Sequence, residues 1–395
     1  MPLVLLLVLA VATAAAGDSA AVGEFVARHW RRPLAPQGVP PARFSALERS
    51  LQPESCGTCH AVQFADWRTS IHAASMGPGI AGQLVEMAPR EARGCYVCHA
   101  PLAEQAPYVP APGGGVTPNR LFDRALHARG VPCAGCHVRN HQRFGPPRRD
   151  GSVDDRAPRA PLPHGGVTRT PAFLASEFCA GCHQFAPGGF AVNGKLVQDT
   201  YEEWKASRFA RDGVQCQDCH MPDRRHLWRG IHDAEMVRGG LAIDAHVDGG
   251  PYRVGDVATV VLSVTSVGVG HAFPTYVTPR VILRVELVDA AGAVVPGTAE
   301  ETVIARDVTL DLARENFDTR LAPGATAELR YRRRVDAAGL RARARVVVEP
   351  DAFYTRFFDA LLTQGAGRGE AQIREARASA RRSPFTVFTR DVPLT

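Results

Sequence analysis

The chain has 395 residues, of which 45% are hydrophobic, 22% charged and 7% aromatic. This composition is typical of folded globular domains and excludes a disordered or fibrous protein, and the length is enough for two or three domains with cores of their own. The formal net charge of +6 is spread along the chain, and so weak an excess gives no reason to expect a nucleic-acid partner.

The first expected element is an export signal. Residues 2–16 are uncharged and apolar, and they end in small residues with an Ala-x-Ala site at Ala14 to Ala16, which indicates a signal peptide. The run is shorter than the roughly 20 residues that span a bilayer, although an uncleaved anchor is the alternative. We therefore expect a periplasmic or secreted protein without a direct membrane span, which begins near Gly17 with an N-terminal segment over 17–54.

All ten cysteines fall in five CxxCH motifs. The motifs comprise Cys56, Cys59 and His60; Cys95, Cys98 and His99; Cys133, Cys136 and His137; Cys179, Cys182 and His183; and Cys216, Cys219 and His220. Two thiols about one helical turn apart can each form a thioether with a porphyrin vinyl group, and the histidine that follows can bind the iron. Zinc ribbons need no fixed histidine after the cysteines, and disulfides need no such pattern. The motifs therefore predict five covalently attached c-type haems (heme c, iron).

The region that carries the motifs, 55–240, is expected to form a pentahaem cytochrome c domain of helices and irregular segments, in which the haems pack against one another. A Trp-x-x-Ser pattern follows the first motif and again the fourth, which indicates a duplicated module. We place the modules at 55–143 and 172–240. The segment between them, 144–171, is rich in Pro, Gly and Arg and predicts a surface linker.

From about residue 242 the pattern changes to β-branched runs. The runs are Val257–Ser266, Arg280–Asp289, Thr326–Arg334 and Arg341–Glu349, separated by turns rich in Gly, Pro and Asp. Such spacing predicts an antiparallel β-sandwich of the immunoglobulin-like kind over 241–350. A helical tail over 351–395 follows, with helices at Asp351–Leu362 and Glu370–Arg382 and a strand at Thr386–Arg390. The expected fold class is therefore α+β and multidomain.

Three stretches of the chain resemble the multihaem cytochromes c of the cytochrome c-554 group (cytochrome c-552/4-like). They are CGTCHAVQFADWRTSIHAAS, GVPCAGCHVRNH and CQDCHMPDRRHLWRGIHDAEM, and the likeness covers about residues 55–235. The loop GVGHAFPT followed by a sandwich resembles a domain appended in some relatives. Because each motif histidine fills one axial position of its iron, the residue at the other position decides whether that iron is closed or open.

Five further histidines are candidates for the second axial positions. In the group that the chain resembles, a histidine soon after Trp-x-x-Ser serves a neighbouring haem, and His72 holds that place. His141 resembles the ligand of the family's CxxCH-G-x-G-x-x-H pattern, although its gap is shorter. His226 and His232 stand six residues apart, a spacing at which related cytochromes use both imidazoles, and His271 would reach a haem from the sandwich. For each of them, an ordinary core or surface histidine is the alternative.

Other side chains stand in reserve as ligands: His29, His127, Met76, Met87 and Met221. Methionines more often serve in packing. The second module has Phe209 where the first has His72, so one haem depends on a remote ligand or stays five-coordinate. Several of the many arginines are expected to pair with haem propionates.

These patterns predict an exported pentahaem cytochrome that relays electrons between redox partners through closely packed, mainly bis-histidine haems. The expected partners are other redox proteins as electron donor and acceptor, a membrane-bound complex among the candidates. The alternative is a multihaem oxidoreductase acting on a small nitrogen or sulfur compound at one open haem. Against an enzyme, the pentahaem nitrite reductases of similar appearance carry a lysine in one motif, whereas all five motifs here end in histidine. No catalytic residue is predicted.

Overall fold

The computed structural model describes residues 19–153 and 162–394, and the predicted signal peptide lies outside them. The chain divides into two compact units. The first comprises the described residues up to 183 together with 214–228 and 367–369, and the second comprises 184–213, 229–366 and the described residues from 370 onward. All five CxxCH motifs lie in the first unit.

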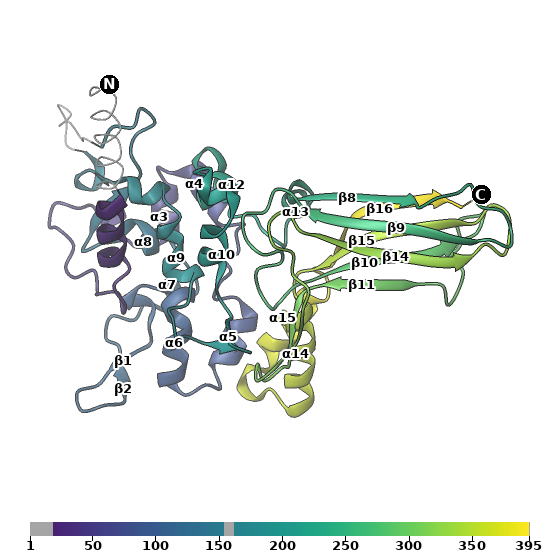
Figure 1. The fold of residues 1–395 in the computed structure, drawn as a ribbon. Coiled ribbons are helices and arrows are strands. Elements are labelled where there is room, and N and C mark those ends of the chain that lie inside the picture. The colour runs from purple at the N-terminus through teal and green to yellow at the C-terminus, as the bar shows by residue number, and fades with distance from the viewer. Residues whose placement is uncertain (1–18, 154–161, 395) are drawn as a thin grey trace, which may run out of the picture. The chain divides into compact units, whose positions relative to one another are not determined.

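The first unit is built from short helices joined by irregular segments (Figure 1). After a helix over 19–29, its α-helices are α2 (Ala46–Arg49), α3 (Pro53–Gly57), α4 (Ala61–Trp67), α5 (Pro78–Leu84), α6 (Pro89–His99), α7 (Arg124–His127), α8 (Cys133–His137), α9 (Glu177–His183) and α12 (Cys216–His220). Its short strands are β1 (Tyr108–Pro110), β2 (Val116–Pro118), β3 (Val138–Arg139), β4 (Gln142–Gly145) and β5 (Thr168–Arg169). Single 3-10 turns lie at Ala103–Gln105, Pro163–Gly165, Pro171–Leu174, Pro222–Arg224 and Gly367–Gly369.

Buried apolar side chains of the first unit form separate small clusters. One joins Phe25 and Trp30 near the N-terminus to Leu126 and Phe178. Another gathers around Tyr96, which lies inside the second motif. Clusters of this size leave much of the interior to the residues of the CxxCH motifs.

The two larger sheets of the second unit are antiparallel. The four-stranded sheet has the order β11 (Glu300–Ile304), β10 (Arg280–Val288), β15 (Arg341–Glu349) and β16 (Phe385–Pro393). The three-stranded sheet has the order β14 (Thr326–Arg334), β9 (Val257–Ser266) and β8 (Leu241–Val247). Register is long and regular in the larger sheet, where β10 and β15 pair from Arg280 opposite Glu349 to Val288 opposite Arg341.

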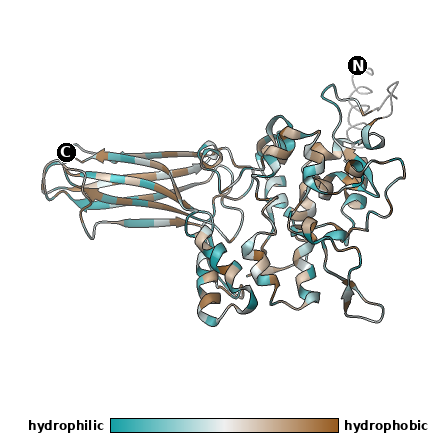
Figure 2. Ribbon diagram, turned by 180° about the vertical axis from the view of Figure 1, so that it is seen from behind, coloured by the Kyte–Doolittle hydropathy of each residue, from teal (hydrophilic) through white to brown (hydrophobic). Residues whose placement is uncertain are grey.

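Alternation of apolar and polar residues explains why these segments form strands. In β15, Ala344 and Val346 are fully buried, whereas the arginine between them is partly exposed, as expected for a strand with one face on a core. Figure 2 shows the same alternation of hydrophobic and hydrophilic residues along the strands. Leu262 of β9 and Leu283 of β10 belong to one buried cluster, so the two sheets pack face to face.

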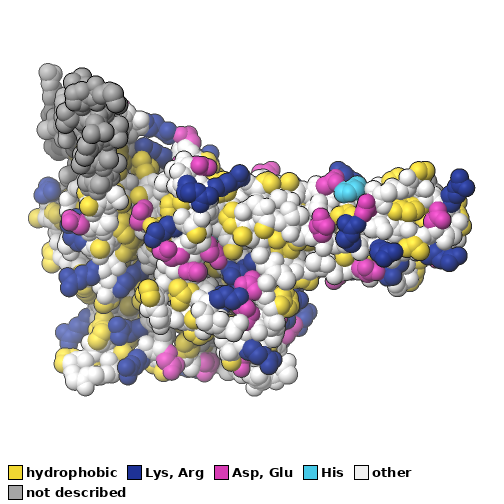
Figure 3. Space-filling view, in the orientation of Figure 1, with side chains coloured by type: hydrophobic (Ala, Val, Ile, Leu, Met, Phe, Trp, Pro, Cys, Tyr) yellow, Lys and Arg dark blue, Asp and Glu magenta, His cyan; other side chains and the backbone are white. Residues whose placement is uncertain are grey.

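The second unit also contains smaller elements. They are β6 (Ala191–Val192), β7 (Lys195–Leu196), α10 (Thr200–Lys205), α11 (Arg208–Arg211), α13 (Ala234–Gly240), β12 (Arg306–Val308), β13 (Glu315–Asp318), α14 (Ala352–Gln364) and α15 (Glu370–Ala380). Basic and acidic side chains lie interspersed over the strands on the face seen in Figure 3. Among residues 19–153 and 162–394, no helix combines the length and the apolar character needed to cross a membrane.

The prediction of antiparallel sheets in the C-terminal part is confirmed. Strands β9, β14 and β15 have the predicted bounds, and β10 is one residue shorter than predicted. The two predicted helices correspond to α14 and α15, and the predicted last strand is a longer one, β16, which pairs with β15. Strands β8, β11, β12 and β13 were not predicted individually. The immunoglobulin-like character of the sandwich stays a prediction.

Candidate haem sites

Each CxxCH motif lies at a helix end. Helices α6, α8, α9 and α12 all end at their motif histidine. The first motif differs, because α3 ends at Gly57 and His60 is the N-terminal cap of α4. Residues three apart on a helix lie on the same side, so a helical CxxC places its two thiols side by side, as attachment to one macrocycle requires.

None of the ten cysteines forms a disulfide. Three hydrogen-bonded pairs form between thiols of different motifs: Cys56 with Cys133, Cys98 with Cys182, and Cys179 with Cys216. The hydrogen bond from its partner lowers the pKa of Cys56 to about 7. These contacts bring the first motif next to the third, the second next to the fourth, and the fourth next to the fifth.

Two pairs of imidazoles lie at the separation expected across one iron. The ring centres of His72 and His183 are 6.2 Å apart, and those of His137 and His226 are 6.1 Å apart. Imidazole nitrogens bind metals at about 2.0 Å and the ring centre lies roughly 1 Å behind the nitrogen, so two histidines on one metal have ring centres about 6 Å apart. Each pair joins a motif histidine to a predicted second ligand, so these residues fit a haem iron.

The residues just before the third motif hold the loop that carries His72. The indole N–H of Trp67 donates to the carbonyl oxygen of Val131 at 2.7 Å, and the N–H of Val131 donates to the carbonyl oxygen of His72 at 2.9 Å. A Cβ at Gly130 would come within 2.6 Å of that same oxygen, so glycine is required there. Burial lowers the pKa of His72 to about 3, which keeps the ring in the neutral form that binds metals.

A buried carboxylate fixes the loop of His226. Asp66 accepts two hydrogen bonds from the Arg225 guanidinium, at 2.7 and 2.6 Å, and a third from the backbone N–H of His226 at 3.0 Å. The hydrogen bond from Arg225 holds the pKa of Asp66 below its usual range. Nδ1 of His226 lies 3.1 Å from the carbonyl oxygen of Arg224, and such a bond leaves Nε2 for a metal.

The same arrangement of the two ring nitrogens recurs at other histidines of the first unit. Nδ1 of His99 lies 2.8 Å from the carbonyl oxygen of Ser75, and Nδ1 of His137 lies 2.8 Å from that of Phe144. A carbonyl at Nδ1 fixes the tautomer and orients the ring of a metal-bound histidine. Backbone carbonyl oxygens therefore orient the rings of His99 and His137.

The reserve histidines differ from one another in this respect. Nδ1 of His127 lies 2.7 Å from the carbonyl oxygen of Gln105, which leaves Nε2 for other partners. His29 is buried and uses Nε2 instead, 2.8 Å from the carbonyl oxygen of Cys136.

The other three predicted second ligands have different surroundings. His141 lies in the first unit with Nε2 3.1 Å from the carbonyl oxygen of Gly38. His232 and His271 lie in the second unit. There, Nε2 of His232 is 3.1 Å from Oδ1 of Asp351, and Nδ1 of His271 is 2.9 Å from the carbonyl oxygen of the next residue. The assignment of these three histidines as ligands stays a prediction.

Comparison with known proteins agrees with this geometry. Residues 55–138 match the family described as cytochrome c554 and c-prime. This match includes the first three CxxCH motifs and supports a multihaem c-type cytochrome of the c554 group. A cytochrome of this group holds covalently bound haem c, transfers electrons and has redox proteins as partners.

The fold of the cytochrome is also seen in a solved structure. It is similar to a penta-heme cytochrome c552 from Thermochromatium tepidum, with a TM-score of 0.57 and 16% sequence identity. The similarity covers 88% of this chain and 100% of that chain, so it includes parts of both units. No curated protein matches the sequence.

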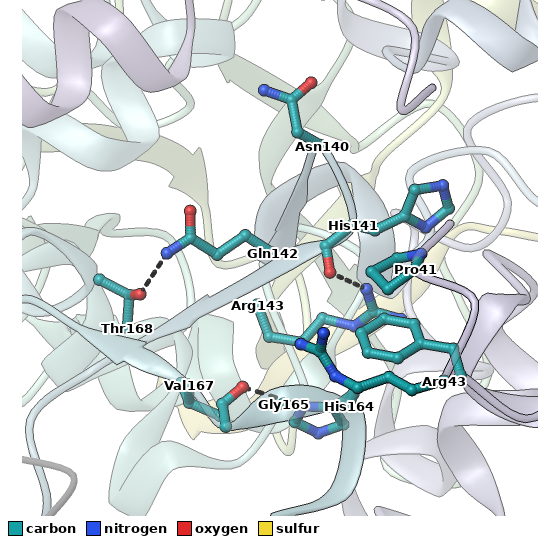
Figure 4. A pocket seen from close by; sticks show the side chains of 12 residues that line it. Pro41, Arg43, Asn140, His141, Gln142, Arg143, His164, Gly165, Val167 and Thr168 are labelled. Carbon is teal, nitrogen blue, oxygen red and sulfur yellow. Dashed lines mark hydrogen bonds between the residues drawn. The ribbon is translucent and has the colours of Figure 1, made fainter. Parts of the chain in front are cut away.

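The first unit of the cytochrome also contains a cavity of about 420 Å³ that the sequence did not predict (Figure 4). Its lining includes Arg43, Phe44, His141, Arg143 and His164. His164 lies in the predicted linker, where the lack of periodicity gave no reason to assign it a role. The only sequence feature that marks this histidine is the pair of glycines after it, Gly165 and Gly166. In the structure both glycines have positive φ.

Proposed function

We propose that this cytochrome carries five haems, one on each CxxCH motif, and relays electrons through them between other redox proteins outside the cytoplasm. The observation that carries the proposal is the pairing of His72 with His183 and of His137 with His226 at ring-centre separations of 6.2 and 6.1 Å. A haem iron held by two imidazoles takes up and releases one electron without an open position for a substrate.

The residues of the chain have three tasks in this function. Paired cysteines anchor each macrocycle, motif histidines bind one side of each iron, and His72 and His226 bind the other side at the fourth and third motifs. Asp66 and Val131 act as positioning residues, because they hold the backbone of the two second ligands. The contacts between thiols of different motifs support close spacing of the groups, and close spacing is what transfer between neighbours requires.

Export follows from the chemistry of attachment and from the apolar leader at residues 2–16. Thioether formation belongs to oxidising compartments outside the cytoplasm. We therefore place the mature protein in the periplasm or among secreted proteins, with redox proteins, soluble or membrane-bound, as donor and acceptor.

Replacement of the proposed second ligands tests this function. His72→Ala and His226→Ala are each expected to convert one low-spin haem to high spin, because one axial position loses its imidazole. The measurement is the absorption and EPR spectrum of the oxidised protein, with intact mass as the control for five attached haems. A mass with fewer haems, or low-spin spectra unchanged in both variants, contradicts the proposal.

A second candidate function, an oxidoreductase for a small nitrogen or sulfur compound, is favoured by one observation. Among the described residues, neither His99 nor His60 has an imidazole partner like those of the His72–His183 and His137–His226 pairs. An iron at the second motif without a second ligand would be open to substrate. Binding of carbon monoxide to the reduced protein distinguishes the two functions. If all five haems have two axial ligands, the absorption spectrum stays unchanged, whereas one haem with an open position shifts about one fifth of the Soret band.

A further inference from the structure

Trp228 has a backbone conformation that a bulky residue rarely adopts. Its φ is 42°, in the left-handed region where large side chains are outliers. The residue stands two positions after His226 and ends the stretch 214–228 of the first unit. Such a conformation costs free energy and persists only where the surrounding contacts fix it.

Contacts with three histidines fix Trp228 in this conformation. Its backbone N–H donates to the carbonyl oxygen of His220, the last residue of the fifth motif, at 2.9 Å. Its ring centre lies 4.7 Å from that of His72, with the planes at 83°, and 5.1 Å from that of His226, with the planes at 86°. Both are edge-to-face contacts, an arrangement that aromatic rings favour. One indole therefore contacts both of the proposed second ligands.

The two rings that Trp228 contacts stand at different angles to the motif histidines opposite them. The planes of His137 and His226 differ by 33°. Those of His72 and His183 differ by 67°. A bond to a metal fixes one nitrogen of an imidazole but leaves the plane of the ring to its neighbours. Because the indole meets both rings nearly at right angles, rotation of either ring would break an edge-to-face contact.

The ring of His72 depends on this contact more than the ring of His226 does. Nδ1 of His226 also lies 3.1 Å from the carbonyl oxygen of Arg224. Among the residues that the structure describes, no hydrogen bond holds the ring of His72. The indole is therefore expected to have its larger effect at the fourth motif.

We infer that Trp228 is a positioning residue shared by two haem sites, because its indole holds the ring planes of His72 and His226. This inference rests on the proposed function, in which these histidines are the second ligands at the fourth and third motifs. The axial ligands set the electronic state of a haem iron. In an oxidised low-spin haem, nearly parallel imidazoles give a rhombic EPR signal, and imidazoles closer to perpendicular give a signal at larger maximum g.

The EPR spectrum of the oxidised protein tests the ring planes without any change at Trp228. His72→Ala and His226→Ala each remove one low-spin signal and so assign it. We expect the signal lost in His226→Ala to be the more rhombic, because it comes from the 33° pair. The signal lost in His72→Ala should have the larger maximum g, because it comes from the 67° pair. The reverse order, or two signals of one type, overturns the inference.

Two variants of Trp228 test the indole itself. Trp228→Leu keeps apolar bulk but removes the ring, and we expect both assigned signals to shift, the signal of the His72 site more, while the haems stay low-spin and the other signals stay in place. Trp228→Phe keeps an aromatic ring and is expected to return both signals toward their parent positions. Unmoved signals in Trp228→Leu, a shift of only one of them, or equal shifts in Trp228→Phe overturn the inference.

Tyr108→Ala is the matched control. It removes an aromatic ring that is 36% exposed from the hairpin of β1 and β2, which lies apart from α4 and α12 (Figure 1). We expect it to keep the parent spectrum, and the same shifts in this variant as in Trp228→Leu also overturn the inference.

Intact mass separates this inference from the proposed function. Fewer than five haems in the parent, or low-spin spectra unchanged in both histidine variants, contradicts the proposed function. Five haems with both signals assigned and unmoved in Trp228→Leu overturns only the role of Trp228. If the leucine variant retains fewer than five haems, the types of the two assigned signals in the parent decide.

Discussion

The two units of the molecule fill their interiors in different ways. In the second unit, a single cluster of Val, Leu and Ala side chains from both sheets forms the core, and many of them are fully buried. In the first unit, the apolar clusters are small, and buried or partly buried cysteines and histidines occupy the space between them. The comparison teaches that the second unit is stabilised by its own side chains, whereas the first depends on groups attached to it.

The largest expected effect comes from removing those groups. In a full-length chain made without haem attachment, we expect the first unit to lose most of its helical structure, because a fold built around a bound group loses that stabilisation when the group is absent. The sheets of the second unit are expected to remain. Limited proteolysis with mass analysis measures this difference, and protection of the first unit equal to that in the haem-loaded protein would contradict it.

A core substitution in the second unit should give the opposite result. Leu283 has no exposed surface, so Leu283→Ala is expected to destabilise that unit by about 2–5 kcal/mol through the lost contacts and the cavity that remains. The matched control is Val257→Ala, because Val257 is 51% exposed and its truncation should change stability by less than about 0.5 kcal/mol. Denaturant unfolding followed by far-UV circular dichroism measures both. Haem absorption at concentrations below the transition should be unchanged, and a changed haem spectrum would show that the two units are not independent.

The smallest effect concerns the pH dependence of the second unit. Burial alone would raise the pKa of Asp318, but hydrogen bonds from Arg320 at 2.9 Å and from Lys195 at 2.7 Å hold it well below the usual value of 3.8. A depressed folded-state pKa contributes stability that is present above pH 4 and lost as the pH falls toward the folded-state value. We expect Asp318→Asn to cost about 1 kcal/mol at pH 7, with the difference from the parent shrinking at pH 3.

Urea unfolding at the two pH values measures this difference. Asp336→Asn is the control, because Asp336 is 75% exposed and lies 3.6 Å from its nearest cation, Arg334. A difference between parent and Asp318→Asn that stays the same at pH 7 and pH 3 would be evidence against the proposed role of the ion pair.

The difference between the two interiors also explains how much of the fold could be predicted from the sequence. Strands such as β14 and β15 could be placed to the residue because alternate side chains enter an apolar core, and that periodicity is visible in the sequence. Short strands such as β12 have too few residues to show a period. The motifs predicted the attachment sites from their spacing alone.

The second ligands were harder to predict because they depend on contacts between distant segments. His72 and His226 could be selected by resemblance, and the structure pairs each with a motif histidine. His141 was selected from the sequence by its resemblance to the family's CxxCH-G-x-G-x-x-H pattern. Only the folded chain shows that Nε2 of His141 lies 3.1 Å from the carbonyl oxygen of Gly38.

The pairing of His137 with His226 has a consequence for assembly. A chain is synthesised from its N-terminus, so His137 emerges early, whereas His226 emerges only after the fifth motif is complete. A third iron bound by His226, as proposed, would therefore gain this ligand only after all five motifs have emerged. An intermediate with this position still open would give the attachment machinery access to the third macrocycle until the segment that carries His226 arrives.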